Sequence, residues 1–242
     1  MAQPSIIGST TNNKAYEAAS DSGTDRVFSV AIPAGANTVI AVCGIDAAES
    51  GNDLISGLAI SGLTGATELH DLSISASSNV RATRLGIFDV RACGAGTLTV
   101  TASLTTGSSA ASILGVVCTD GFVESFTSFV ETRADYGEVK TFSGNMTNNL
   151  MVLLGIFDQD INDWNFTGTG VTSLFETNHS GNGISTVAAS QETGTASKTI
   201  AYNDTPSGDD FIAVSVLLSK QPNAFGDIDP RGDIISHDII TN

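Results

Sequence analysis

The sequence has little charge, and very little of that charge is positive. Only 15% of its 242 residues are charged, and 26 Asp and Glu stand against 10 Lys and Arg, which gives a formal net charge of −16. Nucleic acid is itself an anion and is bound by basic surfaces, so this balance excludes a nucleic-acid partner. It also argues against a helical bundle, because the exposed faces of such helices need Glu, Lys and Arg.

Cysteine and long apolar runs are scarce too. Cys43, Cys93 and Cys118 are the three cysteines, widely spaced and without a Cys-x-x-Cys pair, so neither a disulfide framework nor a zinc site is expected. Cys43 and Cys118 lie in apolar, strand-like runs and should be buried free thiols. No apolar run reaches the length of a membrane helix, and residues 1–10 have neither a basic nor a long apolar region. We therefore expect no membrane span, no secretory signal and folding in a reducing cytosol.

What the sequence does have is many small residues, including 25 glycines, around short runs rich in Val, Ile, Phe and Thr. Such runs, separated by Gly, Asn, Asp and Ser clusters, are typical of an all-β fold. Residues 97–101 alternate between Thr and apolar side chains, which predicts one exposed face, whereas the continuously apolar residues 150–154 should lie deep in the core. A helix fits only residues 13–20. The predicted strands span residues 26–32, 38–45, 82–90, 97–104, 111–118, 150–157, 185–190, 197–202 and 211–218.

The chain contains an internal repeat, because segments of the first half recur in the same order in the second. Residues 37–45 match 148–156 at an offset of 111, residues 65–69 match 170–174 at 105, and residues 113–117 match 212–216 at 99. The shrinking offset indicates shorter loops in the second copy, since loops tolerate deletion better than strands. The two copies span about residues 25–120 and 137–219.

Two arrangements of these copies are open. Each copy could be its own small sandwich, or both could interleave in one larger double-sheet sandwich. The joining segment, residues 121–137, has no proline and contains the apolar residues Phe122, Val123, Phe126, Phe129 and Val130. A linker between independent domains should be polar, whereas this one can run along a sheet, which favours the single sandwich. The predicted organisation is an N-terminal arm (1–24), a β-sandwich (25–220) and a C-terminal arm (221–242).

A succession of strand and turn motifs over residues 25–220 carries a family resemblance. It runs from a Val/Ile-rich strand ending in Gly44, through the Gly-x-Thr-x-Leu turn of residues 65–69, to Phe-Ile-Ala-Val-Ser-Val-Leu-Leu at residues 211–218. This pattern resembles a jelly-roll β-sandwich domain of the kind found in phage virion proteins and bacterial surface proteins. The family's usual tryptophan and second glycine around the turn are replaced here by Ser-Gly-Leu-Thr-Gly at residues 61–65. The resemblance implies a jelly-roll-like double-sheet scaffold built from two sequence-related halves, with no catalytic residues.

The loop after residues 150–157 holds the candidates for a metal or a glycan. Its acidic cluster begins like a calcium loop but lacks the glycine and the closing glutamate of an EF-hand, so a solvated loop is expected and a calcium site is the alternative. Trp164, the only tryptophan, lies close to Phe166 and could contact a sugar. A carbohydrate-binding module is therefore the alternative function. The oxygen-bearing candidates are Asp158, Asp160, Asn162 and Asp163.

No catalytic set is recognisable in the sequence. The chain has no Gly-x-Ser-x-Gly elbow, no phosphate-binding glycine loop after a strand and no close acid pair. His70 and His179 have no second His or Cys at ligand spacing, so exposed loop positions are expected for both. We therefore expect neither an enzyme nor a cofactor.

Both arms carry isoleucines that a free tail would leave exposed. Termini are disordered unless tied down, so contacts with other proteins or with further copies would explain them; the alternative is that the arms fold back on their own sandwich. The leading prediction is a structural virion protein of a phage, such as a capsid decoration protein or another exterior head or tail component, assembled in the host cytoplasm. Its partners would be other virion proteins and copies of itself, without nucleic acid or membrane. The predicted partner-binding residues are Ile6, Ile7, Ile228, Ile234, Ile235, Ile239 and Ile240.

Overall fold

The fold is all-β, as predicted. The computed structural model describes residues 3–7, 16–18, 25–47, 55–76, 81–104, 110–131, 139–143, 147–157, 171–177, 187–192, 197–201 and 211–220. Within these ranges every strand pair is antiparallel and no residue is helical. The described residues accordingly contain no helix that could cross a membrane.

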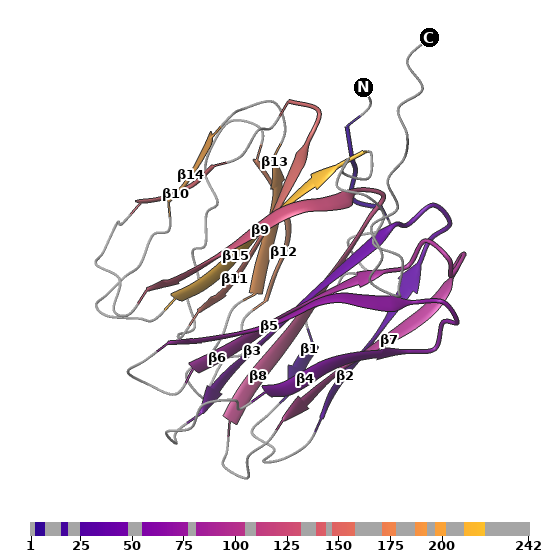
Figure 1. Cartoon of the computed structure of the whole chain (residues 1–242). Helices are drawn as coiled ribbons and strands as arrows, with labels where there is room; N and C mark the ends of the chain where they lie inside the picture. The colour runs from indigo at the N-terminus through magenta and orange to yellow at the C-terminus, as the bar shows by residue number, and fades with distance from the viewer. Residues whose placement is uncertain are drawn as a thin grey trace.

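The described strands form four sheets (Figure 1). Sheet A holds, in spatial order, β1 (Tyr16–Ala18), β8 (Ala110–Thr119), β3 (Thr38–Ala47), β6 (Arg81–Asp89) and β5 (Thr67–Ala76). Sheet B holds β2 (Arg26–Ile32), β7 (Gly96–Leu104) and β4 (Ile55–Ser61). Sheet C holds β12 (Val171–Thr177), β13 (Val187–Glu192), β11 (Leu150–Phe157), β15 (Phe211–Ser219) and β9 (Phe122–Glu131), and sheet D holds β10 (Val139–Ser143) and β14 (Ser197–Ala201).

Sheet A lies between sheets B and C, so both of its faces are covered (Figure 1). One core fills the space between sheets A and B and takes Val39 and Ala41 from β3. The other fills the space between sheets A and C and takes Ile40 and Val42 from the same strand. Successive side chains of a strand point to opposite faces. The continuous apolar run of β3 therefore follows from its place in a central layer, where every side chain meets another sheet.

Two patterns predicted from the sequence are confirmed by burial. In β7, Leu98 and Val100 are fully buried against sheet A, whereas Thr97 is exposed on the outer face of sheet B. In β11, all of residues 150–154 are buried, as their continuous apolar character predicts. Of these, Leu150, Val152 and Leu154 pack against sheet A.

All nine predicted strands are present, with ends that differ from the prediction by at most two residues. The strands outside that set are β1, β4, β5, β9, β10 and β12. The helix expected over residues 13–20 is wrong for its described part, because Tyr16–Ala18 form β1 and pair with β8. Pairing with the open edge of a sheet outweighs local helix propensity there.

The strands of each half pair in nested order. In the first half β1 pairs with β8, β2 with β7 and β3 with β6. In the second half β9 pairs with β15, β10 with β14 and β11 with β13. Every pair among the described strands joins members of one half. The interleaved single sandwich expected from the sequence is therefore corrected: the halves stack, with sheet A against sheet C. The joining segment does run along a sheet, since β9 forms an edge of sheet C.

Counted within each half, the five-stranded sheets have the strand orders 1-8-3-6-5 (β1-β8-β3-β6-β5) and 1-7-3-5-4 (β9-β15-β11-β13-β12). The two orders correspond when β4 is taken to have no counterpart among the described strands of the second half. Strands β5 and β12, which lie at corresponding edges of the two sheets, each have one shift in register against their neighbouring strand. The shift leaves Leu69 of β5 unpaired in one sheet and Leu174 of β12 unpaired in the other. These bulges lie 105 positions apart, which is the offset at which residues 65–69 recur in the sequence.

Candidate functional site

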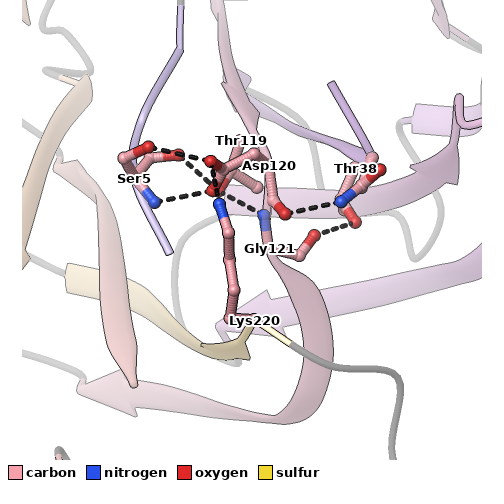
Figure 2. Close-up of polar contacts among 7 residues, drawn as sticks. Ser5, Thr38, Thr119, Asp120, Gly121 and Lys220 are labelled. Carbon is pink, nitrogen blue, oxygen red and sulfur yellow. Dashed lines mark hydrogen bonds and ion pairs between the residues drawn. The ribbon is translucent and has the colours of Figure 1, made fainter. Parts of the chain in front are cut away.

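Three parts of the chain that are far apart in sequence meet at one place, which we call the end junction (Figure 2). They are the N-terminal segment (residues 3–7), the end of β8 with its connection to β9 (residues 119–121) and Lys220, which directly follows β15. Residues 3–7 of the predicted N-terminal arm therefore contact the sandwich at the point where the predicted C-terminal arm begins.

The connection from β8 to β9 passes between sheets A and C at Gly121. A Cβ atom on Gly121 would lie 2.9 Å from the Cβ of Pro4 and 3.0 Å from the Cβ of Leu218. Real Cβ atoms essentially never come as close as the first distance and rarely as close as the second, and both neighbouring atoms are attached directly to a backbone that cannot easily move. Glycine is therefore required where the chain crosses from one half to the other.

Asp120 is the polar centre of the end junction (Figure 2). The backbone N–H of Ser5 donates to Oδ1 at 2.8 Å and the Ser5 hydroxyl donates to Oδ2 at 3.0 Å. The Lys220 ammonium also donates to Oδ2. Partial burial raises the pKa of Asp120, but the bonds from Lys220 and Ser5 outweigh it and hold the pKa below its ordinary value. The carboxylate is therefore charged at neutral pH and ties both ends of the described chain together.

The N-terminal segment lies beside β8 as a further piece of strand at the edge of sheet A. The Ser5 carbonyl accepts the Asp120 N–H at 3.2 Å and the Thr119 hydroxyl at 2.9 Å, and the Ile7 N–H donates to the Cys118 carbonyl at 3.0 Å. Ile6 forms a bridge with Thr119. The side chain of Ile6 packs on the core between sheets A and C, and that of Ile7 on the core between sheets A and B. This alternation is that of a β-strand.

Further hydrogen bonds hold the backbone of residues 119–121. Asn37 donates its backbone N–H to the Thr119 carbonyl at 2.9 Å and its side-chain amide to the Asp120 carbonyl. The Thr38 hydroxyl donates to the Gly121 carbonyl at 2.8 Å, and the Gly121 N–H donates to the Thr119 hydroxyl at 3.0 Å. A crossing between two sheets leaves backbone groups without ladder partners, and these bonds satisfy them.

The structure places two of the predicted partner-binding residues. Ile6 and Ile7 are half-buried against the protein's own cores, so the described part of the N-terminal arm folds back on its own sandwich. The hypotheses of a C-terminal arm, a calcium site and a glycan contact stay predictions from the sequence. Their residues lie outside the described ranges: Ile228, Ile234, Ile235, Ile239, Ile240, Asp158, Asp160, Asn162, Asp163, Trp164 and Phe166.

The cysteines are free thiols, and two of them are buried, as predicted. Burial raises the pKa of Cys43 to about 12, although nearby Arg26 opposes the shift, and burial alone raises that of Cys118 to about 12. Cys93 is half-buried, and its pKa is raised by burial and then by Asp89. A thiol nucleophile must ionise, so Cys43 and Cys118 are inert in the folded protein.

Metal ligands do not gather in the part of the chain that the structure describes. No group of three or more His, Cys, Asp or Glu residues there is arranged to hold a metal ion. His70 is exposed but lies on strand β5, where the sequence suggested a loop. Its ring lies 5.0 Å from that of Phe126 on β9, a contact between the two halves.

Comparisons with known proteins found no match. No family model matches the chain, and neither the search of curated proteins nor that of solved structures gave a match. The resemblance to jelly-roll domains therefore stays a prediction from sequence motifs. A function has to be argued from the geometry of the chain itself.

Sequence reasoning missed the residues that build the end junction, above all Ser5, Asp120 and Lys220. Each is an ordinary polar residue, and their contacts span 115 and 100 positions. One signal was present, the Asp-Gly pair directly after the apolar strand of residues 111–118. An Asp-Gly pair usually indicates a turn, whereas here the glycine permits a close crossing and the aspartate binds both ends.

Proposed function

We propose that the protein is a structural virion component of a phage that acts through protein–protein contacts. The observation that carries the proposal is the end junction, where residues 3–7 and Lys220 meet at one point of a body of stacked sheets. An attachment function needs a stable body and a segment that can leave it. Lys220, the residue before the predicted C-terminal arm, is fixed to this body at Asp120, beside residues 3–7. Such a protein would attach by its arms and present the rest of the sandwich outward.

We further propose that each half is a jelly roll and that the halves arose by duplication. The nested pairs β1–β8, β2–β7 and β3–β6 result when a long hairpin folds over on itself, which produces a double-sheet jelly roll. The strand orders of sheets A and C, which correspond once β4 is left out, and the corresponding bulges at Leu69 and Leu174 support the duplication. Jelly rolls are common in viral capsid proteins, which agrees with the proposed role.

The described charged pairs also support a scaffold. Arg84 pairs with Asp71 across strands β6 and β5, and Arg91 pairs with Asp89 at the end of β6. Together with Lys220 and Asp120, these pairs fix neighbouring segments to each other. The net charge of −16 favours an outward-facing surface over contact with the packaged nucleic acid.

Removal of residues 221–242 tests the proposal. In particles assembled from the genome that encodes this chain, we expect the shortened protein to be missing from purified virions. The purified shortened protein should still unfold cooperatively, because its last residue would be Lys220 and the end junction would be complete. A full-length variant with Ile234, Ile235, Ile239 and Ile240 changed to serine is the matched control for length. Normal incorporation of both variants would refute the attachment role.

A further inference from the structure

The N-terminal segment makes its described hydrogen bonds with residues more than 100 positions away in the chain. Ser5 bonds to Thr119 and Asp120, Ile7 bonds to Cys118, and the Gln3 side-chain amide donates to the Asn149 carbonyl in the second half. Pro4 is buried and would meet any Cβ on Gly121. The surface that receives the segment consists of residues 118–121, Asn149, Leu218 and Lys220, and we call it the acceptor site.

The acceptor site would bind the same segment from another chain equally well, because it contains no residue from the region next to the segment. A segment that adds to a sheet edge is held by backbone hydrogen bonds and by pockets for alternate side chains. Both are present here, since residues 5–7 pair with β8 while Ile6 and Ile7 enter different cores. These contacts do not depend on which copy supplies the segment.

The sequence between the segment and β1 favours exchange between copies. Residues 8–14 read Gly-Ser-Thr-Thr-Asn-Asn-Lys and include no apolar side chain. The segment itself ends in the apolar pair Ile6 and Ile7. If it leaves, the Cys118 carbonyl and the Asp120 N–H lose their partners, and an edge of this kind recruits another strand. A neighbouring copy at high local concentration offers the same strand.

We propose that the acceptor site binds residues 3–7 of a second copy of this chain, so that copies are joined by exchange of their N-terminal segments. The proposal rests on the part of the proposed function that assigns the arms to contacts between copies. Its test uses purified protein, so its failure would leave the virion role, which is tested by particle incorporation, unaffected.

The pairing of residues 5–7 with β8 shows where an engineered disulfide could detect the exchange of N-terminal segments between copies. Hydrogen bonds from the Ile7 N–H to Cys118 and from the Asp120 N–H to Ser5 flank the pair formed by Ile6 and Thr119. This pattern makes Ile6 and Thr119 a pair without hydrogen bonds of its own, the kind in which side chains lie closest and a disulfide can form. The test therefore uses Ile6→Cys and Thr119→Cys in a background with Cys43→Ala, Cys93→Ala and Cys118→Ala.

Chains with the single change Ile6→Cys are mixed with chains carrying only Thr119→Cys, refolded together at high protein concentration and oxidised. We expect a disulfide-linked dimer in which mass spectrometry maps the bond to positions 6 and 119. A mixture of Ile6→Cys with Ser29→Cys, on the exposed face of sheet B, should not give a bond between positions 6 and 29. The double variant Ile6→Cys/Thr119→Cys shows that the bond can form. If that variant forms the bond within one chain at every concentration and the mixture never forms it, the proposal is wrong.

Discussion

The two five-stranded sheets close the same edge in different ways. In sheet C the strand beside β15 is β9, a continuous strand of ten residues that follows β8 after the short crossing at Gly121. In sheet A the corresponding place beside β8 is taken by β1, with three residues, and by the bridge at Ile6. The edge of sheet C is thus formed by β9, whose start is joined to the first half. The edge of sheet A is formed by β1 and Ile6, two short pieces from the N-terminal part of the chain.

The difference shows where the molecule can change partners. β9 begins at a crossing that is held by hydrogen bonds donated by Asn37 and Thr38 and by the bond from the Gly121 N–H to the Thr119 hydroxyl, so it cannot leave without disrupting both halves. The N-terminal segment is held by backbone bonds at one sheet edge, by the side chains of Ile6 and Ile7, and by the charge on Asp120. Such a segment can leave while the two cores stay intact.

The largest losses of stability are expected from substitutions in the two hydrophobic cores on either side of sheet A. Phe88 of β6 fills the core between sheets A and B, and Leu85 of the same strand fills the core between sheets A and C. Phe88→Ala should lower the free energy of unfolding by about 3–5 kcal/mol and Leu85→Ala by about 2–5 kcal/mol. Because sheet A belongs to both cores, denaturant unfolding should show one transition in each variant. Two transitions, with Phe88→Ala shifting only one of them, would show that the halves unfold independently.

A smaller loss is expected at the crossing between the halves. Gly121→Ala places a methyl group against Pro4 and Leu218, and relief of this overlap should cost about 1–3 kcal/mol in thermal or denaturant unfolding. Gly57→Ala is the matched control, because nothing lies within 4 Å of its added Cβ, and it should change stability by less than about 0.5 kcal/mol. Equal effects of the two substitutions would mean that the crossing is not tightly packed.

The smallest effect is expected at the charge that holds the N-terminal segment. Asp120→Asn removes a carboxylate bound by Ser5 and Lys220, and since these side chains are partly exposed, the loss should be about 1 kcal/mol at neutral pH. The pKa of Asp120 is lower in the folded than in the unfolded chain. Its contribution is therefore complete above the unfolded pKa of about 3.9 and is lost as pH falls through the lower folded value.

Unfolding midpoints of the wild type and of Asp120→Asn, measured as the pH is lowered, check this expectation. The difference between the two should shrink in acid and vanish below the folded pKa of Asp120. Ser5→Ala is the control, because it removes one hydroxyl donor but keeps the backbone bond from Ser5 and the carboxylate. A difference that stays constant down to acid pH would show that Asp120 acts through packing rather than charge.

The strands that the sequence missed all lie at sheet edges, although two edge strands, β2 and β14, were predicted. The run at residues 38–45 is continuously apolar because it lies in the central layer, sheet A, and residues 150–154 of the second run are all buried. Such runs are recognisable without a structure. β5, with Thr-Glu-Leu-His-Asp at its start, is largely exposed at the edge of sheet A, so its sequence carries no strong period. The pattern of apolar and polar residues in a strand reflects which side chains are buried, and an exposed edge strand such as β5 has few buried side chains.

The candidate site could not be predicted in the same way. Ser5, Asp120 and Lys220 are brought together by the path of the backbone over the whole chain, and no spacing between them records it. The joining segment was recognisable as apolar, but its apolar residues gave no information on which sheet β9 joins. Stacking instead of interleaving depends on long-range strand pairing, which periodicity does not report.

The central claim is that the N-terminal segment forms the edge of sheet A that corresponds to the edge formed by β9 in sheet C. Amide hydrogen exchange of Asp120, whose N–H donates to the Ser5 carbonyl, tests it most directly. In the full chain we expect this amide to be protected, like the amides of β9 that pair with β15. In a chain that begins at residue 8, the Asp120 amide should lose its protection while the β9 amides keep theirs. Equal exchange of the Asp120 amide in both chains would contradict the account.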